Sequence, residues 1–379
     1  MKVSIRVIQN YNGLHDIERA WNTLIDQCSD GPILLSGFVE QFINFNSSSG
    51  WAPLLLAISV DGKLVGISPL KVKRTFGFRL VKFLPKLFSQ DFVIKSQYRE
   101  ICISHTLDFL FKTLKSQLVK LTLPGESLNL QILKQKCRAN GIQFGTKPEM
   151  GHRILPVECT WEEFEAFRGG NFKRKFKKIA RNLDRAGSWK ITCLGKGNEE
   201  LVAKKMLDVE RVSWKEGWRS QTGMEGDEDL LMVWNGSQHA SKSEPNFNWS
   251  VWFLELNNQT LAYALVFQYK EVAFIVKTSY DERYRKFYPG IFIINAAIRE
   301  LFGRRQVKKI DFLTDLPFME TWTSLSLPRI GVIMSQKNIL QIVIRFAFAN
   351  ENMKNILSLV LAPLLKRAAR ARSITDFLG

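Results

Sequence analysis

The chain has 379 residues, of which 45% are hydrophobic and 24% are charged, values typical of a globular protein with a sizeable core. This length is long for one domain and sufficient for two. The formal net charge of +18 favours an anionic partner, such as nucleic acid, a nucleotide cofactor, an acidic polymer or a membrane surface, without choosing among them.

Cysteine and histidine usage argues against disulfide and metal chemistry. The five cysteines form no Cys-x-x-Cys pair and the four histidines are scattered, so we expect reduced thiols and no metal. The first residues lack an apolar signal core, and no run of about 20 apolar residues occurs. These features predict a cytoplasmic protein without a transmembrane helix.

Short elements alternate along the first half of the sequence, which argues for an α/β class. The periodicity predicts a strand over 3–8, helices over 15–27, 36–45, 107–118 and 128–140, and a short strand over 119–123. Between them, Asp61-Gly62 separates two apolar runs and signals a hairpin. Gly66, inside its second strand, marks a bulge or a close approach of another chain segment.

The second half repeats this series after a junction predicted at 145–158. Its expected elements are helices over 161–167, 171–185 and 199–214, a strand over 189–194 and a hairpin over 249–269. The hairpin resembles that of the first half, so we interpret the chain as two copies of one α/β unit. We therefore predict domains at 1–150 and 151–335, with a basic amphipathic helical tail at 336–379. Residues 212–247 have no clear period and predict a mobile loop.

A strand, a basic loop and a helix follow one another between 271 and 302. The free backbone N–H groups and partial positive charge of such a helix N-terminus suit a phosphate. Gly290 allows close approach of a ligand to the backbone. The candidate cofactor-binding residues are Arg283, Tyr284, Arg285, Lys286 and Gly290. An ordinary loop-to-helix junction would have the same pattern.

The predicted helix over 171–185 carries seven cations against one acid, Asp184, which exceeds what solubility needs. We interpret it as a surface for an anionic ligand: a nucleotide-linked or phospholipid-linked sugar, or RNA. The candidate substrate-binding residues are Lys173, Arg174, Lys177 and Arg181 from this helix, and Lys215 from the following one.

Four segments of the second half resemble the CelD-like (cellulose biosynthesis) branch of the GNAT acetyltransferase superfamily, which is related to Fem-type peptidyltransferases. They are the basic helix at 172–187, Glu210-Arg-Val-Ser-Trp-Lys215, the Tyr280-Asp281…Tyr284…Pro289-Gly290 signature and Lys309-Ile-Asp311-Phe312. Trp21, Leu35-Ser36 and the run DGKLVGISPL resemble the family's N-terminal part. The resemblance covers about residues 15–325 and rests on the order and spacing of the motifs.

The resemblance implies two tandem GNAT-like domains, each a mixed twisted sheet flanked by helices. It also implies acyl transfer from acyl-CoA to an amine, such as an amino sugar in cell-envelope polysaccharide biosynthesis. A carboxylate can accept the proton of the amine, and the candidates are Asp281, Glu210 and Asp311, with Asp281 first because it follows the strand before the basic loop. Asp281 could equally cap the loop or pair with Arg283. Tyr280 could protonate the leaving thiolate.

One departure from the family leaves other functions open. Met319 stands where the family has Lys, which puts catalysis of the Fem type in doubt. The alternatives are a Fem-type aminoacyl-tRNA-dependent transferase and a non-catalytic GNAT-like module that binds an anionic polymer or lipid. In either case the tail could contact the inner face of a membrane peripherally.

Overall fold

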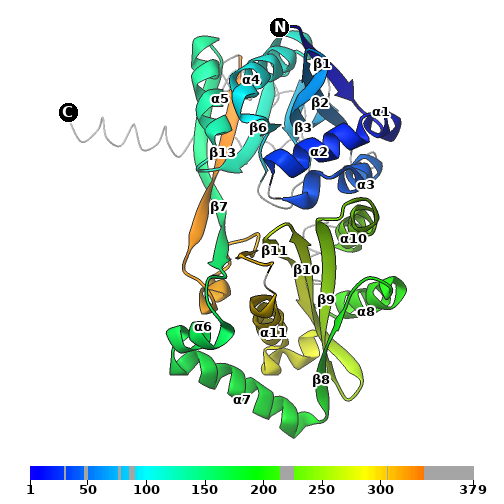
Figure 1. Cartoon of the computed structure of the whole chain (residues 1–379), viewed down its shortest axis with the longest axis vertical. Helices are drawn as coiled ribbons and strands as arrows, with labels where there is room; N and C mark the ends of the chain where they lie inside the picture. Colours follow the sequence, from blue (N-terminus) through cyan, green and yellow to red (C-terminus); the bar gives the residue numbers. More distant parts are fainter. Residues whose placement is uncertain are drawn as a thin grey trace, which may run out of the picture.

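The computed structural model describes residues 1–29, 31–46, 50–75, 78–84, 90–213, 226–304 and 306–336. The predicted tail at 336–379 therefore lies almost wholly outside the described residues. One twisted, mixed sheet of 13 strands runs through both halves of the elongated molecule, with helices on both faces (Figure 1). The chain thus has the mixed α/β fold that its sequence predicts.

The first half contributes six strands and five α-helices. The strands are β1 Val3–Ile8, β2 Trp51–Val60, β3 Lys63–Thr75, β4 Phe78–Phe83, β5 Val93–Ile94 and β6 Leu118–Pro124. The helices are α1 Tyr11–His15, α2 Glu18–Cys28, α3 Ser36–Asn46, α4 Arg99–Asp108 and α5 Leu128–Ala139, with short turns η1 Pro32–Leu34, η2 Ser96–Tyr98 and η3 Phe109–Thr113. The helix predicted over 107–118 begins at Arg99 instead, because its buried face includes Cys102 and Ile103.

Among the described residues, the second half contributes seven strands and five α-helices. The strands are β7 Gln143–Pro156, β8 Trp189–Leu194, β9 Phe247–Leu256, β10 Gln259–Tyr269, β11 Val272–Tyr280, β12 Lys309–Asp311 and β13 Ser326–Ser335. The helices are α6 Trp161–Arg168, α7 Gly170–Ala186, α8 Glu199–Arg211, α10 Gly226–Ser243 and α11 Pro289–Gly303, with turns η4 Glu282–Phe287 and η5 Pro317–Thr321.

The sheet order is β1-β2-β3-β4-β6-β13-β7-β12-β11-β10-β9-β8, with β5 beside β3. Each half contains antiparallel strands followed by one parallel pair, β4 with β6 and β11 with β12. This recurrence agrees with the internal repeat predicted from the two hairpins. The stretch expected to be a junction is β7, whose first part pairs with β13 and whose end pairs with β12 (Figure 1). It therefore links the two halves as a continuous strand.

The loop predicted over 212–247 is wrong for residues 226–243, which form helix α10. Leu230, Val233 and Trp234 are buried on its inner face, together with the small residues Ser237 and Ala240. Small and polar residues at these inward positions hide the helical period from a search for large apolar side chains. Helix α10 packs on α3 of the first half (Figure 1).

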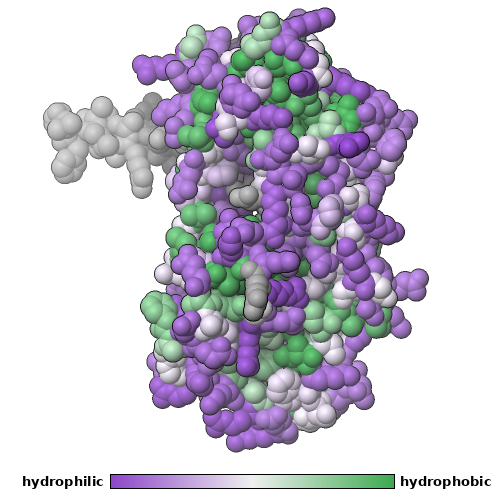
Figure 2. All heavy atoms as spheres, viewed as in Figure 1, coloured by the Kyte–Doolittle hydropathy of each residue, from purple (hydrophilic) through white to green (hydrophobic). Residues whose placement is uncertain are grey.

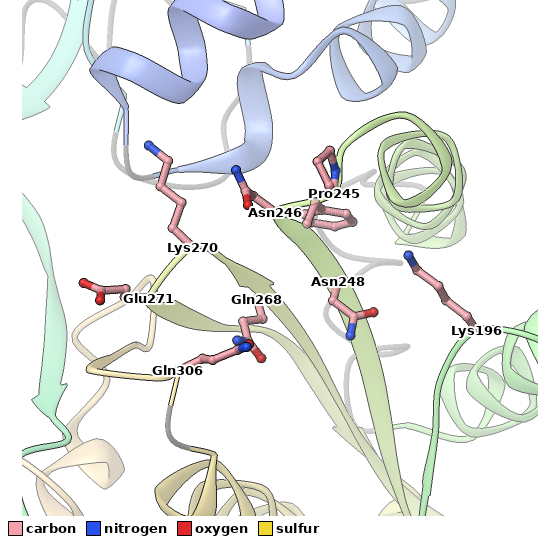
Figure 3. A pocket seen from close by; sticks show the side chains of 9 residues that line it. Lys196, Pro245, Asn246, Asn248, Gln268, Lys270, Glu271 and Gln306 are labelled. Atoms are coloured by element: carbon pink, nitrogen blue, oxygen red, sulfur yellow. The ribbon is translucent and has the colours of Figure 1, made fainter.

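A polar pocket of about 470 Å³ lies at the seam between the two halves (Figure 3). Four of its lining residues carry carboxamides: Asn246, Asn248, Gln268 and Gln306. Lys270 points from it toward the first half and donates hydrogen bonds to the carbonyl oxygens of Asp26 and Ser29 (Figure 3). The Asn246 amide also donates to the Asp26 carboxylate at 3.2 Å. These contacts join the halves, and the pocket contains none of the predicted site residues.

Candidate active site

The sheet opens between β11 and β12. These parallel strands pair at only three positions, ending at Phe274 opposite Asp311, although β11 continues to pair with β10 as far as Tyr280. Past Phe274, within the described chain, this free edge of β11 makes only one isolated bridge, between Asp281 and Ser213. The open edge exposes backbone groups to whatever enters between the two strands.

A bulge lies on the open part of β11. Leu265 of β10 faces Lys277 and Val266 faces Ile275, so Val276 is the extra residue. A bulge re-aims the backbone N–H groups around it and is common next to active sites. Sequence reasoning proposed that N–H groups of a splayed strand could hold an oxyanion, and the bulge supplies a specific position for that role.

The open edge leads to the N-terminus of α11. Tyr288 adopts a left-handed conformation, with φ 51° and ψ 46°, and turns the chain from η4 into the helix. The N–H of Phe292 donates to the carbonyl of Tyr288 at 3.1 Å. The N–H groups of the preceding turn have no partner within the helix. A helix of 15 residues therefore begins with free donors and a partial positive charge at the end of β11.

The predicted cofactor-binding residues form two groups whose side chains contact different elements. Arg285 is 77% exposed with a loose ion pair to Glu282 at 3.4 Å, and Lys286 lies over the ring of Phe287 at 5.1 Å. Gly290 is buried, and a Cβ atom added there would lie 3.1 Å from the Tyr280 ring. These residues border the helix N-terminus.

Arg283 and Tyr284 turn toward α8 and β10 instead. Arg283 binds Asp281, and the Tyr284 hydroxyl donates to the Gln259 carbonyl oxygen at 3.0 Å. Arg283, Gln259 and Asp281 line a separate small pocket with Lys204 and Lys205 of α8. Of the predicted cofactor set, only Arg285, Lys286 and Gly290 border the helix N-terminus directly.

Asp281 serves as the cap of η4. Its carboxylate is fully buried and accepts hydrogen bonds from the backbone N–H of Arg283 at 3.0 Å, from the Arg283 guanidinium and from the Gln259 amide at 3.3 Å. This is the loop-cap arrangement that the sequence left open beside catalysis. Both carboxylate oxygens of Asp281 accept hydrogen bonds, and the adjacent Arg283 guanidinium is one of the donors.

Tyr280 packs against the first turn of α11 and is half-buried. Burial raises the pKa of its hydroxyl, and the Glu282 carboxylate adds to the rise, opposed by Arg285. The hydroxyl therefore remains protonated at neutral pH and can donate a hydrogen bond. Its place beside Gly290 puts it at the N-terminus of α11.

Glu210 is fully buried at the end of α8. Its carboxylate accepts a hydrogen bond from the Tyr263 hydroxyl at 2.5 Å and lies 3.6 Å from the Lys277 ammonium. Ser213 follows Glu210 closely in the sequence, and Ser279 follows Lys277. Both serines are buried, and neither hydroxyl has a hydrogen-bond partner among the described residues. Burying a charge pair together with hydroxyl groups that lack hydrogen bonds lowers the stability of the fold. Such a cluster is therefore typical of a functional site.

Asp311 forms a buried pair with His152, and both side chains are 6% exposed. The distances from His152 Nδ1 to the two carboxylate oxygens are 2.9 Å and 3.0 Å. The carboxylate also accepts the N–H of Leu313 at 2.7 Å. Asp311 is the last residue of β12 that pairs with β11. The pair therefore stands at the point where the two strands diverge.

The cations near this pair are held by other groups. Arg153 binds Asp315 and Glu320. Arg329 donates to the carbonyl of Leu313 at 3.1 Å. Burial lowers the pKa of the Arg329 guanidinium, and the negative charge of Asp311 counters part of this effect.

The basic helix predicted over 171–185 is α7, and Phe172, Phe176, Ile179 and Leu183 form its buried side. Lys173, Arg174, Lys177 and Arg181 are all exposed on it. Lys173 and Lys177 border an 860 Å³ groove between α7 and α11, whose floor includes Phe176, Trp189 and Phe292. Lys215 lies outside the described residues.

Sequence reasoning missed His152 and Lys277. His152 precedes Arg153 at the start of an apolar run, and Lys277 interrupts the apolar pattern of β11. A charged or titratable residue inside a predicted buried strand is the signal that could have identified both. In the described residues no cluster of three or more His, Cys, Asp or Glu could hold a metal ion. The described helices include none long and apolar enough to cross a membrane.

Comparison with known proteins shows what the second half is similar to. Residues 170–318 match the sequence model of the acetyltransferase (GNAT) domain. Three solved structures share the fold along most of the chain: FemX, L-PGS from Bacillus licheniformis and a conserved protein from Bacteroides thetaiotaomicron.

The identities to these three proteins are low. FemX is 11% identical, with 87% of this chain and 97% of FemX covered at a TM-score of 0.54. L-PGS is 8% identical, with 92% and 96% covered at 0.53. The Bacteroides protein is 8% identical, with 88% and 100% covered at 0.54. No curated protein matches the sequence. The match over 170–318 makes this part of the chain similar to the acetyltransferase (GNAT) domain, and the structural similarities support the fold alone.

Proposed function

We propose that the protein transfers an acyl group from acyl-CoA to an amine, with an amino sugar of cell-envelope polysaccharide as the acceptor class. The observation that carries this proposal is the opening between β11 and β12, which leads directly to the free N-terminus of α11. A thioester arm fits along an open strand edge, and a pyrophosphate fits at a helix N-terminus. The GNAT match over 170–318 includes all of these elements.

Donor binding uses the first turn of α11 and the cations beside it. The N–H groups at Gly290 and Ile291 can donate to pyrophosphate oxygens, with Arg285 and Lys286 adding positive charge. The protonated Tyr280 hydroxyl can donate to the same phosphates. Gly290 is required here because a side chain would press on the Tyr280 ring. The thioester supplies the acyl group in this proposal.

Transfer requires a neutral amine, a stabilised carbonyl oxygen and a proton acceptor. Backbone N–H groups at the Val276 bulge are suited to the developing oxyanion. His152 suits the proton acceptor, because Asp311 holds the proton on Nδ1 and leaves Nε2 with its lone pair. The amine nitrogen forms the new C–N bond and gives its proton to Nε2 of His152, while the C–S bond breaks and CoA leaves as the thiolate. The imidazolium of His152 then returns this proton to the thiolate, directly or through solvent, so that CoA is released as the thiol.

Glu210 and Lys277 have a supporting role in this proposal. Since Glu210 is fully buried and hydrogen-bonded to Tyr263, its carboxylate holds the Lys277 ammonium beside the open edge of β11. A fixed positive charge at that edge favours the negative oxyanion. This assignment leaves Asp281 as the loop cap.

The environment of Met319 supports acyl-CoA as the donor. Its side chain is 5% exposed and packs with Phe312 and Trp322 in the apolar core beside α11. The position at which the resemblance expects the Fem-type Lys is therefore apolar in this chain. A donor that needs no lysine there is consistent with this environment.

A second candidate is transfer from an aminoacyl-tRNA, as in the Fem-type alternative. The observation that favours it is the row of exposed cations on α7, because RNA phosphates bind such rows. A third, non-catalytic candidate would bind acyl-CoA or an anionic polymer without turnover.

Calorimetric titration with acetyl-CoA and with desulfo-CoA tests the proposal. Arg285→Glu/Lys286→Glu is expected to weaken both bindings at least about tenfold, since each cation contributes roughly 1 kcal/mol or more to a charge-assisted contact. Both residues are exposed, so folding should be unaffected.

The matched control is Lys63→Glu/Lys134→Glu, which reverses two exposed cations of the first half. Binding that the control weakens equally would reflect net charge and not a site. If the folded wild-type protein gives no heat with either acetyl-CoA or desulfo-CoA, the proposal that acyl-CoA is the donor is wrong. Binding without release of CoA thiol in the presence of amines would favour the non-catalytic candidate.

A further inference from the structure

The outer face of α7 is a row of unpaired cations. Arg174, Lys178, Arg181 and Arg185 follow one another at intervals of four, three and four residues, which places them on one side of the helix. This side lies opposite the buried residues Phe176, Ile179 and Leu183. The row extends along most of a 17-residue helix, which is about 25 Å long.

These cations lack acidic partners. Within the described chain, no carboxylate forms an ion pair with Arg174, Lys178, Arg181 or Arg185. The nearby Lys173 differs, because it pairs with Glu165 at 3.1 Å on the groove side of the helix. Asp184, the single acid of α7, accepts a hydrogen bond from the Trp189 indole at 2.7 Å. The outer face is therefore a concentrated positive surface, and the groove side is electrostatically mixed.

An exposed aromatic residue lies next to this row. Phe167, near the end of α6, is 85% exposed, and no other large hydrophobic side chain of the described residues is as exposed. The turn at Gly169 and Gly170 joins it directly to α7. Moving an exposed phenylalanine side chain from water into an apolar layer lowers the free energy of the system. An acidic membrane offers such a layer directly below its negatively charged headgroups.

We propose that the outer face of α7 docks the protein on a membrane surface rich in acidic phospholipids, with Phe167 entering the boundary between headgroups and acyl chains. Lys178, Arg181 and Arg185 bind lipid phosphates. This proposal rests on surface chemistry and does not depend on acyl transfer.

The shape of the face favours a membrane over RNA. A straight, convex helix touches a flat charged surface along its whole length. Its cations then act together, each contributing about a fivefold increase in binding. The row itself contains no aromatic residue on which bases could stack, because its apolar residues face the core. Phe167 precedes the row in the chain, at the end of α6 that leads into α7.

The test is flotation of the full chain with phosphatidylcholine vesicles, with and without phosphatidylglycerol. The wild-type protein is expected to float only with the acidic vesicles. Lys178→Glu/Arg181→Glu/Arg185→Glu should lower the partition coefficient at least about tenfold. Phe167→Ala should lower it severalfold. Circular dichroism checks folding, and the corresponding triple glutamine variant replaces the glutamate variant if the latter is unfolded.

Two control variants separate this face from other sources of binding. Lys63→Glu/Lys134→Glu/Arg138→Glu changes the net charge by the same amount on exposed residues of the first half, and it should bind like wild type. Lys366→Glu/Arg367→Glu/Arg370→Glu changes the C-terminal tail, which lies outside the described residues, and should retain most of the binding.

Three results would overturn the proposal. Equal losses in the first-half control and the α7 variant would indicate a non-specific charge effect. A loss in the tail variant alone would place the contact on the tail. Binding of RNA in a gel shift that needs the α7 cations, without vesicle binding, would replace the membrane with RNA and strengthen the aminoacyl-tRNA candidate.

Discussion

His152→Asn is expected to lower the rate of acyl transfer by about 100-fold or more, because a positioned general base commonly contributes that much. Asparagine can still hydrogen-bond to the Asp311 carboxylate, but it has no nitrogen lone pair to accept the proton of the amine. Since His152 lies on β7, away from the α11 N-terminus, the affinity for acetyl-CoA should not change. The measurement is release of CoA thiol with a panel of amino sugars, together with calorimetry of acetyl-CoA binding.

Asp311→Asn should reduce the rate to a similar extent for a different reason. The carboxylate accepts a hydrogen bond from the Nδ1–H group at 2.9 Å, whereas an amide can donate to Nδ1 and favour the tautomer that carries its proton on Nε2. That tautomer cannot act as a base. His152→Asn and Asp311→Asn combined should be no worse than either alone, because both variants remove the same function.

His239→Asn is the matched control, because His239 also pairs with a carboxylate, that of Glu40 at 2.8 Å. It lies on α10, away from the strand opening, and its replacement should leave turnover unchanged. A full rate in His152→Asn, or a loss that appears only as weaker acetyl-CoA binding, would show that the buried pair supports the fold and not the proton transfer.

The strand, turn and helix that we propose for cofactor binding could be predicted as structural elements from sequence because they are local. A strand, a turn and a helix occupy the continuous stretch 272–303, and the period, the Pro-Gly pair and the basic loop all lie within it. The fold class was predictable for the same reason, since the two hairpins and their helices have short-range signals. The bulge at Val276 and the early end of β12 depend on pairing between strands, which no local pattern reveals.

The buried pair that we propose for proton transfer could not be predicted because it is assembled from distant segments. His152 and Asp311 are 159 residues apart in the chain and meet only because β7 pairs with β12. The sequence favoured Asp281 because it is near the loop, but the fold turns this side chain inward as a cap. Helix α10 was missed because its contact with α3 uses glycine and small residues in place of a large apolar stripe.

This α3–α10 contact makes Gly236 a size-sensitive position outside the site. A Cβ atom added at Gly236 would lie 2.5 Å from Phe38 Cδ1 and 3.1 Å from Phe38 Cα. The contact from the α3 side is also close, since a Cβ atom added at Gly37 of α3 would lie 2.9 Å from the Cβ of His239 on α10. The glycine backbone of each helix therefore packs directly against a side chain of the other helix. Phe38 also packs on Phe247 and Phe267 of the second half.

Gly236→Val is expected to lower the free energy of unfolding by about 3 kcal/mol, at the upper end of the cost of overpacking a filled core. Gly236→Ala should also destabilise, by about 1 kcal/mol, although alanine in an open helix would stabilise by a similar amount. The sign of the alanine effect thus distinguishes close packing from helix propensity. Denaturant unfolding followed by tryptophan fluorescence measures both.

Gly170→Ala is the control for these variants, because a Cβ at that helical glycine would meet nothing within 4 Å. It should leave the free energy of unfolding unchanged or raise it slightly. If Gly236→Ala were as stable as Gly170→Ala, the contact between α3 and α10 would have to be looser than this structure describes. Since α3 belongs to the first half and α10 to the second, the loss expected in Gly236→Val would also measure how strongly that contact holds the two halves together.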